Sequence, residues 1–269
     1  MLSRNTRSPI DDIEFLARSD HRVTALVALA ERPRSRADLQ ELTEASTSTI
    51  GRTLREFEHR RWIRRDGHQF EATQLGAFVA SGMQDLIELI ETEQTLRDVW
   101  QWLPPEASGF TLEMGTDAVV TEASIDDPYG PVNRFASLLR ETDRFRFVGF
   151  DVALLEPCKD ELSRRIVDGM DTEIIDPPSV ARYIISTYSE HCAEPLESGH
   201  LTVRLHDDLP AYGVSLFDDR IGISGYNANS GTVQVFLDTD APDAREWAES
   251  TYDSYRREAR PLALETAIE

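Results

Sequence analysis

The chain has 269 residues, enough to bury two hydrophobic cores, and it carries a formal net charge of −21 at pH 7. Its two cysteines are too few for a disulfide framework, and no apolar run reaches the ~18 residues of a membrane span. An acidic excess of this size also argues against nucleic-acid binding by the molecule as a whole, because phosphates repel carboxylates.

The distribution of charge along the chain changes that last conclusion. Residues 1–82 hold 13 arginines against 12 acidic residues, whereas residues 83–269 hold 15 basic residues against 37 acidic ones. Lys159 is the only lysine, and this composition resembles that of proteins from halophilic archaea, whose carboxylates stay hydrated while molar salt screens their repulsion. Only the first third can therefore approach DNA. We expect a soluble cytoplasmic protein, since the polar start lacks a signal-peptide core.

The first third of the chain predicts helices and then a hairpin. Apolar residues at helical spacing predict helices over residues 10–18, 20–31, 36–43 and from Ser46 to near Arg61. Two β-prone runs follow, Trp62–Arg65 and His68–Glu71, and Asp66-Gly67 between them is favoured in two-residue hairpin turns. This order is typical of a helix-turn-helix followed by a wing.

The helix that starts at Ser46 has one face suited to burial and one suited to DNA. Ile50, Leu54 and Phe57 are expected to be buried, and arginines and short hydroxyl side chains lie opposite. Residues 46–65 sum to +4, a local reversal of sign in a very acidic chain. Arginine can bind guanine or phosphate in a bidentate way, and small residues allow close approach. The predicted DNA-binding residues are Arg36, Ser46, Thr47, Ser48, Thr49, Gly51, Arg52, Arg55, Arg64, Arg65, His68 and Gln69.

An alternative remains for these arginines, which could form ion pairs along an ordinary exposed helix face. The order of elements favours DNA binding. The segment Arg36–Gly76, with the run STSTIGRTLREFEHRRWIRRDGHQFEATQLG, resembles the winged helix-turn-helix of archaeal regulators. Arg61 departs from that family, which commonly has glycine there, and we expect it to adopt a helix C-terminal cap conformation.

A long helix is predicted from Thr73 to Trp102, where Pro104-Pro105 follows. Its length of some 30 residues, or ~45 Å, favours a helix that links two domains and contributes to a homodimer, although packing against the second domain also explains an apolar stripe. The predicted domains are residues 1–82 for DNA binding, 83–105 for linkage and dimerisation, and 106–269 for an effector or assembly domain. The apolar positions of the predicted long helix and of the residue after it are Leu75, Phe78, Val79, Leu86, Leu89, Ile90, Leu96, Val99, Trp100 and Leu103.

Alternating strand and helix patterns after residue 105 predict an α/β domain, so the whole chain combines α+β and α/β classes. The predicted helices are Val132–Glu141, Lys159–Asp168 and Asp243–Glu258. The predicted strands are Phe110–Met114, Ala118–Ala123, Phe145–Val152, Asp171–Ile175, Leu201–Leu205, Ala211–Phe217, Arg220–Ser224 and Thr232–Leu237.

Residues 203–259 resemble one half of a phospholipase-D-like domain, through a strand, turn, strand, Gly-Tyr-x-Asn and final helix. The catalytic pattern of such enzymes is His-x-Lys followed by Asp, and this chain has Tyr212, Val214 and Asp219 at the matching positions. Without the imidazole and the ammonium, phosphodiester chemistry is disfavoured. With the winged helix included, the chain resembles archaeal regulators of the methanogenesis and filamentation regulatory protein type, and more distantly sugar-sensing archaeal regulators.

A small-molecule effector site is predicted near Tyr212, Tyr226, Asn227 and Asn229, because phenols and amides at strand ends can orient a polar ligand. The same residues are also typical of an ordinary loop and of a core. The six histidines show no metal spacing, and no cofactor is indicated.

The sequence thus predicts a homodimeric, sequence-specific transcription regulator that binds double-stranded DNA and has no catalytic residues. Two alternatives remain open. One is a DNA-targeted phosphodiesterase or nuclease with a non-standard catalytic set, and the other is a winged helix that binds a protein, against which the positive stretch argues.

Overall fold

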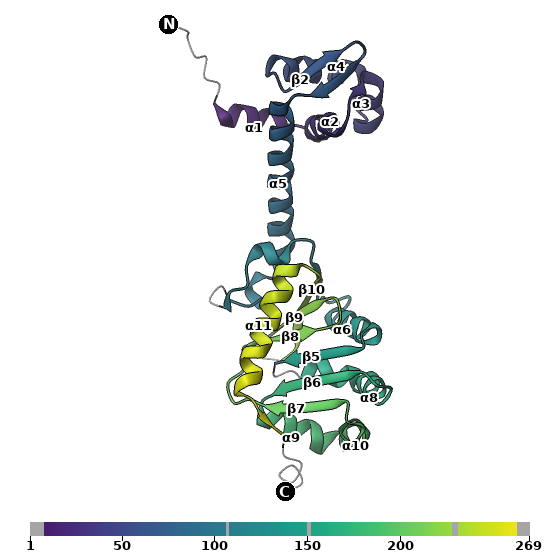
Figure 1. Ribbon diagram of the computed structural model, residues 1–269, viewed down its shortest axis with the longest axis vertical. Coiled ribbons are helices and arrows are strands. Elements are labelled where there is room, and N and C mark those ends of the chain that lie inside the picture. The colour runs from purple at the N-terminus through teal and green to yellow at the C-terminus, as the bar shows by residue number, and fades with distance from the viewer. Residues whose placement is uncertain (1–7, 106–107, 150–151, 228–230, 263–269) are drawn as a thin grey trace. The chain divides into compact units, whose positions relative to one another are not determined.

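The computed structural model describes residues 8–105, 108–149, 152–227 and 231–262. The chain divides into two compact units, Met1–Ile90 and Glu91–Glu269, and each is described by itself (Figure 1). Of the helices described, none has both the length and the apolar composition needed to cross a bilayer.

The first unit combines short helices with a small sheet. Ser8 and Ser35 each accept a backbone hydrogen bond at the start of a helix, and Asp11 and Asp38 return the bond to the capping residue, so both helix starts are encoded locally. The elements are α1 (Pro9–Ala17), α2 (Asp20–Glu31), β1 (Arg34–Ser35), α3 (Arg36–Thr43), α4 (Thr47–His59), β2 (Ile63–Asp66), β3 (Gln69–Ala72) and α5 (Gln74–Leu96).

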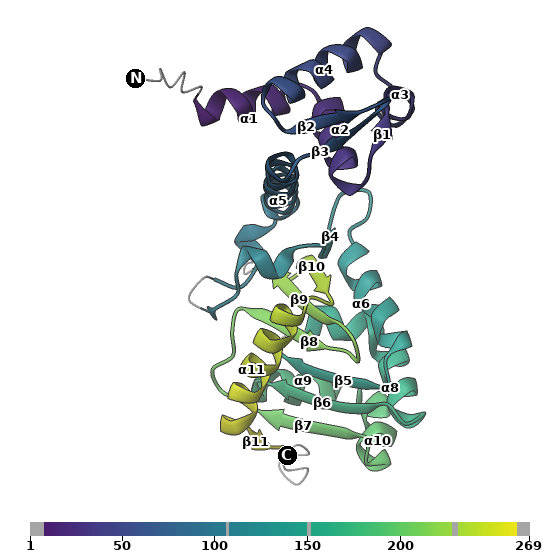
Figure 2. The ribbon, with the colours of Figure 1, turned by 45° about the horizontal axis from the view of Figure 1, so that its top comes forward.

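The sheet of this unit has the order β1-β3-β2, and β2 and β3 form an antiparallel hairpin (Figure 2). The predicted hairpin is confirmed, but the predicted turn at Asp66-Gly67 is wrong by one residue. Asp66 pairs with Gln69, which leaves Gly67 and His68 as the turn. Gly67 has φ +58°, a backbone conformation that glycine adopts without steric cost.

The core of the first unit lies under α4. Ile50, Leu54 and Phe57 are at most 2% exposed, so the predicted buried face of this helix is confirmed. Arg61, just past the helix, has φ +60°, and its N–H donates to the Glu58 carbonyl at 2.9 Å. The predicted cap conformation of Arg61 is therefore confirmed too.

Helix α5 is anchored at its start by Thr73 and Gly76. The Thr73 hydroxyl donates to the Arg61 carbonyl at 2.7 Å and accepts from the Gly76 N–H at 3.2 Å. A Cβ at Gly76 would lie 1.9 Å from the Trp62 carbonyl oxygen, so only glycine permits this contact between helix and hairpin. Thr73 and Gly76, at the end of the run that resembles archaeal regulators, therefore have a packing role.

The predicted helix from Thr73 to Trp102 is too long. Helix α5 ends at Leu96, and Trp100–Trp102 forms a separate 3-10 turn. Leu96, Val99 and Leu103 are at most 6% exposed and belong to a hydrophobic core of the second unit.

The second unit is an α/β domain built on one large sheet, as predicted. Its helices and strands are η1 (Trp100–Trp102), η3 (Leu112–Gly115), β4 (Val119–Glu122), α6 (Gly130–Glu141), β5 (Arg144–Val148), α7 (Val152–Leu155), η4 (Glu156–Cys158), α8 (Lys159–Val167), β6 (Asp171–Asp176), α9 (Pro178–Thr187), α10 (Ser189–Ser198), β7 (Leu201–Leu205), β8 (Tyr212–Leu216), β9 (Ile221–Tyr226), β10 (Val233–Thr239), α11 (Pro242–Glu258) and β11 (Arg260–Pro261).

The strands described have the order β11-β7-β6-β5-β8-β9-β10-β4, with β5, β6 and β7 parallel and the others antiparallel to their neighbours. Helix α11 packs on one face, and α6 packs on the other together with α8 (Figure 1). The predicted strand Phe110–Met114 is wrong, since residues 112–115 form a 3-10 turn. The predicted strand Phe145–Val152 is too long, since β5 ends at Val148 and Val152 is the first residue of α7.

Candidate nucleic-acid interface

The exposed face of α4 carries the side chains that could meet DNA. Thr47, Ser48, Arg52 and Arg55 are exposed, while Thr49 and Gly51 are half-buried. Among the described residues, neither Arg52 nor Arg55 has a carboxylate within ion-pair distance. The N–H donors of these two guanidinium groups are therefore available to a partner.

Arg36 joins this face from the neighbouring helix α3. A Cβ added at Gly51 would lie 3.9 Å from the Arg36 guanidinium carbon, so the small residue leaves room for the arginine beside α4. Arg36 is exposed and forms no ion pair among the residues described. The structure therefore brings Arg36, Gly51, Arg52 and Arg55 into one positively charged surface.

The hydroxyl groups at the start of α4 are partly engaged inside the protein. Ser46 caps the helix, since its Oγ accepts from the Thr49 N–H at 3.2 Å and lies 2.9 Å from the Ser48 Oγ. The Gln40 amide, which the sequence did not suggest as a site residue, donates to the Thr47 Oγ1 at 2.7 Å. Gln40 thus orients a predicted DNA contact, and Ser46 contributes first to the helix cap.

The wing presents Arg64, Arg65, His68 and Gln69 to solvent. Arg64 is 71% exposed but forms a 2.5 Å ion pair with Glu71, and this hydrogen bond raises the pKa of the guanidinium. The Arg65 Nε donates to the Gly67 carbonyl at 2.9 Å. A partner of Arg64 would have to compete with Glu71, which makes the wing a weaker positive surface than the residue count indicates.

Arg60 contributes to the predicted positive charge but not to this surface. Its side chain is 7% exposed, pairs with Asp12 at 3.0 Å and with Glu56 at 2.5 Å, and lies 3.8 Å over the centre of the Phe15 ring. Arg60 therefore joins α1 to α4, and the face that could meet DNA has less charge than the +4 counted over residues 46–65.

His21 supports α4 from behind. Its Nδ1 lies 2.6 Å from the Ser19 hydroxyl and its Nε2 lies 3.3 Å from the buried Thr53 hydroxyl. Burial, followed by the charges of Arg22 and Arg52, lowers the pKa of His21. A neutral imidazole therefore backs the helix at neutral pH.

The tyrosines predicted to form an effector site do not come together. Tyr212 pairs with Gly225 in the sheet, so Tyr226, the next residue, lies on the opposite face, and the two rings belong to different cores. Tyr212 lines an open hollow of about 620 Å³ beside α11. The Asn227 N–H donates to the Thr232 carbonyl at 3.0 Å, and Asn229 lies outside the described residues.

Comparison with known families is informative for both units. Residues 128–258 match the family described as the methanogenesis regulatory protein FilR1, middle domain, and residues 10–95 match the HVO_A0261 N-terminal domain. No curated protein matches the chain. The description of the first of these families is that of a regulatory protein.

Solved structures show only distant likeness. TrmBL2, an archaeal chromatin protein with a novel mode of DNA binding, has a TM-score of 0.42 at 13% identity over 95% of this chain and 100% of its own. Phosphatidylserine synthase of Haemophilus influenzae Rd KW20 has a TM-score of 0.43 at 16% identity over 56% and 41%. The dimethyltransferase RosA of Streptomyces davawensis has a TM-score of 0.21 at 16% identity over 75% and 68%. At these TM-scores none of the three indicates what this chain does.

Proposed function

We propose that this protein is a sequence-specific transcription regulator that binds double-stranded DNA as a homodimer through its first unit. The observation that carries the proposal is the exposed face of α4, where Arg52 and Arg55 stand beside Arg36 without ion-pair partners among the described residues. The whole chain has a net charge of −21, whereas this face carries arginines without ion-pair partners among the described residues. A local positive surface of this kind suits a polyanion such as DNA.

The residues divide by the part of DNA that they would contact. Arg52, in the middle of the exposed face, suits a guanine edge in the major groove, and Arg55 lies on the same face. Thr47 and Ser48 at the helix start suit phosphate oxygens, and the wing residues Arg64 and Arg65 suit the backbone. Base contacts set the sequence preference, and backbone contacts set the affinity for all sequences.

The test uses a site selected from random double-stranded DNA by the full-length protein, with affinity measured by fluorescence anisotropy at one fixed salt concentration. Arg52→Ala should cost about 1–3 kcal/mol, roughly 5- to 150-fold, and relax the preference at one position. Arg64→Ala should weaken all sequences similarly and by less, because Glu71 already shares its charge.

Arg97→Ala is the matched control, since Arg97 is also exposed and ion-paired, to Glu93 at 2.6 Å, but lies in the second unit. The DNA affinity of the Arg97→Ala variant should equal that of the parent protein. Unchanged affinity in the Arg52 and Arg64 variants as well would show that the assigned face does not bind DNA.

The homodimer is proposed from an apolar stripe on α5. Leu75, Phe78, Leu86 and Leu89 recur at spacings of three, eight and three residues, and they are 61%, 82%, 40% and 57% exposed. Gly82 completes the stripe, and a Cβ there would meet nothing within 4 Å. A stripe of this pattern suits a second copy of α5, with Gly82 allowing close approach of the two backbones. Paired recognition helices would then place the half-sites about 10 bp or a multiple apart.

The second unit is proposed to sense a ligand or mediate assembly as a phospholipase-D-like half without its chemistry. Tyr212 and Val214, at the positions of the histidine and lysine, are 8% and 0% exposed. A phenol and an isopropyl group in a sheet core supply neither nucleophile nor phosphate ligand. The rival function, DNA-targeted phosphodiester hydrolysis, would shorten the selected DNA in the same binding mixtures.

A further inference from the structure

Helix α11 borders an open hollow of about 620 Å³ on the surface of the second unit. The α11 residues that line this hollow lie between Asp243 and Tyr255, at the three- and four-residue spacing of one helix face. At 1.5 Å per residue, this stretch of helix is about 18 Å long. The hollow follows α11 for about three turns and therefore suits an extended ligand.

The middle of the hollow is aromatic. Tyr212 of β8 and Trp247 of α11 both line it, are each 8% exposed, and have their ring centres 6.4 Å apart. The Trp247 Nε1–H donates to the Ser108 carbonyl at 3.0 Å, and the Phe110 ring centre lies 5.1 Å from that of the indole. These two contacts fix the orientation of the indole. Aromatic rings attract organic cations through their quadrupole, so this surface favours a cationic ligand over an anionic one.

The charged groups that line the hollow are carboxylates. Asp243 and Glu246 are exposed at its first end, and neither forms an ion pair among the described residues. The described part of the lining contains no lysine, arginine or histidine. The hydroxyl groups of Ser250, Thr251 and Ser254 follow along α11 and can accept hydrogen bonds from a donor.

Acidic charge also acts at the second end of the hollow, beside Tyr255. Burial raises the pKa of the Tyr255 phenol, and the negative charges of Asp208 and Glu258 raise it further. The Glu258 carboxylate lies 3.7 Å from the His206 Nε2, whereas Asp208 forms no ion pair over the ranges that the structure describes. The hollow therefore has negative charge toward both ends and an aromatic surface between them.

We propose that this hollow binds a linear aliphatic polyamine, whose ammonium groups meet the carboxylates at both ends while its methylene chain lies along Tyr212 and Trp247. An organic acid of the same length would be repelled at both ends, and a neutral chain would gain nothing from the carboxylates. Calling the amine an effector rests on the proposed regulatory function. Its binding does not.

Three probes with the same eight-carbon chain test the role of charge: 1,8-diaminooctane, octane-1,8-diol and octanedioate. The indole N–H resonance of Trp247, identified by its loss in Trp247→Phe, reports on the middle of the hollow in the full-length protein. At fixed ionic strength, the diamine should shift this resonance saturably, and the diol and the dianion should not. Equal shifts with the diamine and the diol, or no shift with the diamine, would overturn the proposal.

Because an acidic protein attracts any cation, a matched control separates this site from general attraction. The double variant Asp243→Asn, Glu246→Gln should weaken binding of 1,8-diaminooctane at least tenfold in titration calorimetry. The double variant Glu190→Gln, Glu197→Gln removes the same charge from exposed positions on α10 and should bind as the parent does. Equal affinities in the two double variants would overturn the proposal.

A third variant tests shape with the carboxylates kept. Ser250→Trp places a large side chain in the hollow and should also weaken binding of the diamine at least tenfold. Thermal unfolding of each variant shows whether it folds. Binding of parent strength in folded Ser250→Trp protein would overturn the assignment to this hollow.

DNA affinity, measured in parallel, keeps the two proposals distinguishable. If the diamine fails to bind while DNA binding still depends on Arg52, the hollow proposal fails and the regulatory one stands. If the diamine binds but no DNA sequence is preferred, the hollow proposal stands without its effector role. Diamines also contact DNA directly, and this effect is the same for the parent and the Asp243→Asn, Glu246→Gln variant. A change in DNA affinity that occurs only in the parent would support both proposals.

Discussion

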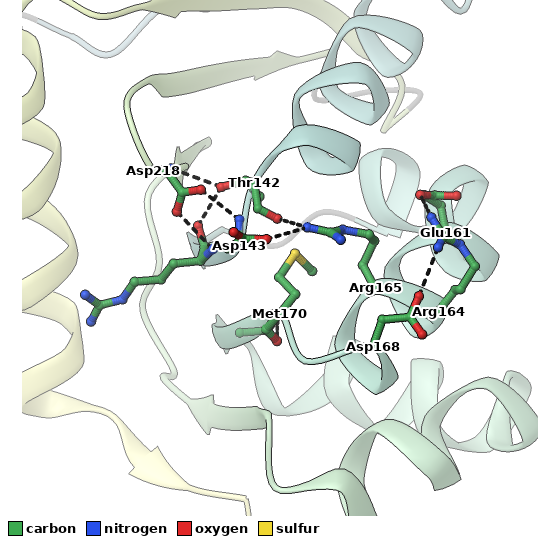
Figure 3. Close-up of polar contacts among 10 residues, drawn as sticks. Thr142, Asp143, Glu161, Arg164, Arg165, Asp168, Met170 and Asp218 are labelled. Atoms are coloured by element: carbon green, nitrogen blue, oxygen red, sulfur yellow. Dashed lines mark hydrogen bonds and ion pairs between the residues drawn. The ribbon is translucent and has the colours of Figure 1, made fainter.

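Asp218 and Asp219 are exposed neighbours on the same turn, and Asp218 is hydrogen-bonded to the segment before β5. The Asp218 carboxylate accepts from the Asp143 N–H at 2.7 Å and the Arg144 N–H at 3.0 Å, and its own N–H donates to the Thr142 Oγ1 at 3.0 Å (Figure 3). The pair of carboxylate bonds ties the turn between β8 and β9 to the start of β5. Asp219, which the sequence resemblance aligned with the aspartate of phospholipase-D-like enzymes, is exposed as well.

We therefore expect Asp218→Ala to lower the free energy of unfolding of the second unit by about 1–2 kcal/mol, because two charge-assisted hydrogen bonds are lost. Asp219→Ala should change it by less than about 0.5 kcal/mol. Urea unfolding followed by circular dichroism measures both. Equal losses in the two variants would contradict this assignment.

Gly76 and Gly82 show how position within one helix changes the role of glycine. Both lie in α5, but a Cβ at Gly76 would overlap the Trp62 carbonyl, whereas a Cβ at Gly82 would meet open space. Gly76→Ala should therefore force the helix away from the hairpin and lower the melting temperature. Gly82→Ala should raise the helix propensity by about 0.5–1 kcal/mol in the monomer. Differential scanning calorimetry on dilute protein compares them, and equal shifts would contradict the argument.

The apolar stripe of α5 leads to a prediction about assembly. Leu89→Glu should break the dimer, because the variant places a carboxylate where the proposed interface excludes water. Gln84→Glu adds the same charge on the side of α5 opposite the stripe and should leave assembly unchanged. Analytical ultracentrifugation at fixed salt gives the masses. A monomeric parent protein, or a dimeric Leu89→Glu variant, would exclude this interface.

On the scale of the whole molecule, ion pairs that join distant elements make stability depend on pH. Glu173 of β6 accepts from Arg204 of β7 at 2.5 Å and from Arg256 of α11 at 2.9 Å. Burial by itself raises the pKa of Glu173, but these hydrogen bonds outweigh it, and the net pKa lies below its usual 4.5. A carboxyl group with a lowered folded pKa stabilises the protein above the unfolded value and loses this contribution as pH falls through the folded value.

Glu173→Gln should thus lower the melting temperature by about 2–4 °C at pH 7, and the difference from the parent should shrink below pH 4.5. Glu190→Gln, an exposed residue at the start of α10, is the control and should differ little at either pH. Melting curves between pH 3 and pH 7 provide the measurement. A difference that grows on acidification would contradict the assigned sign.

Local sequence patterns identified the helices of the first unit, its hairpin and most strands of the second unit, and they showed which face of α4 is buried. The helical spacing of Ile50, Leu54 and Phe57 predicted that all three are buried, and they are. The position of Arg61 just after a helix predicted its left-handed backbone conformation. Such features depend on residues within a few positions of one another. Helices α9 and α10 were not predicted, although Pro178 at the first turn of α9 and Gly199 after α10 are ordinary start and stop signals.

Only the tertiary structure decided which charged and aromatic groups meet. Arg60 reaches Asp12, 48 positions earlier, so one of the positive charges counted over residues 46–65 is paired inside the protein. Tyr212 and Tyr226 were expected to converge, but the alternation of neighbouring strands places them on opposite faces of the sheet. A partly open cavity of about 100 Å³ beside Lys159 lies between α8, α9 and α10 and the strands β6 and β7, and its volume exists only through their packing. A local pattern specifies backbone conformation and burial, whereas a partner is chosen by contacts between segments distant in the sequence.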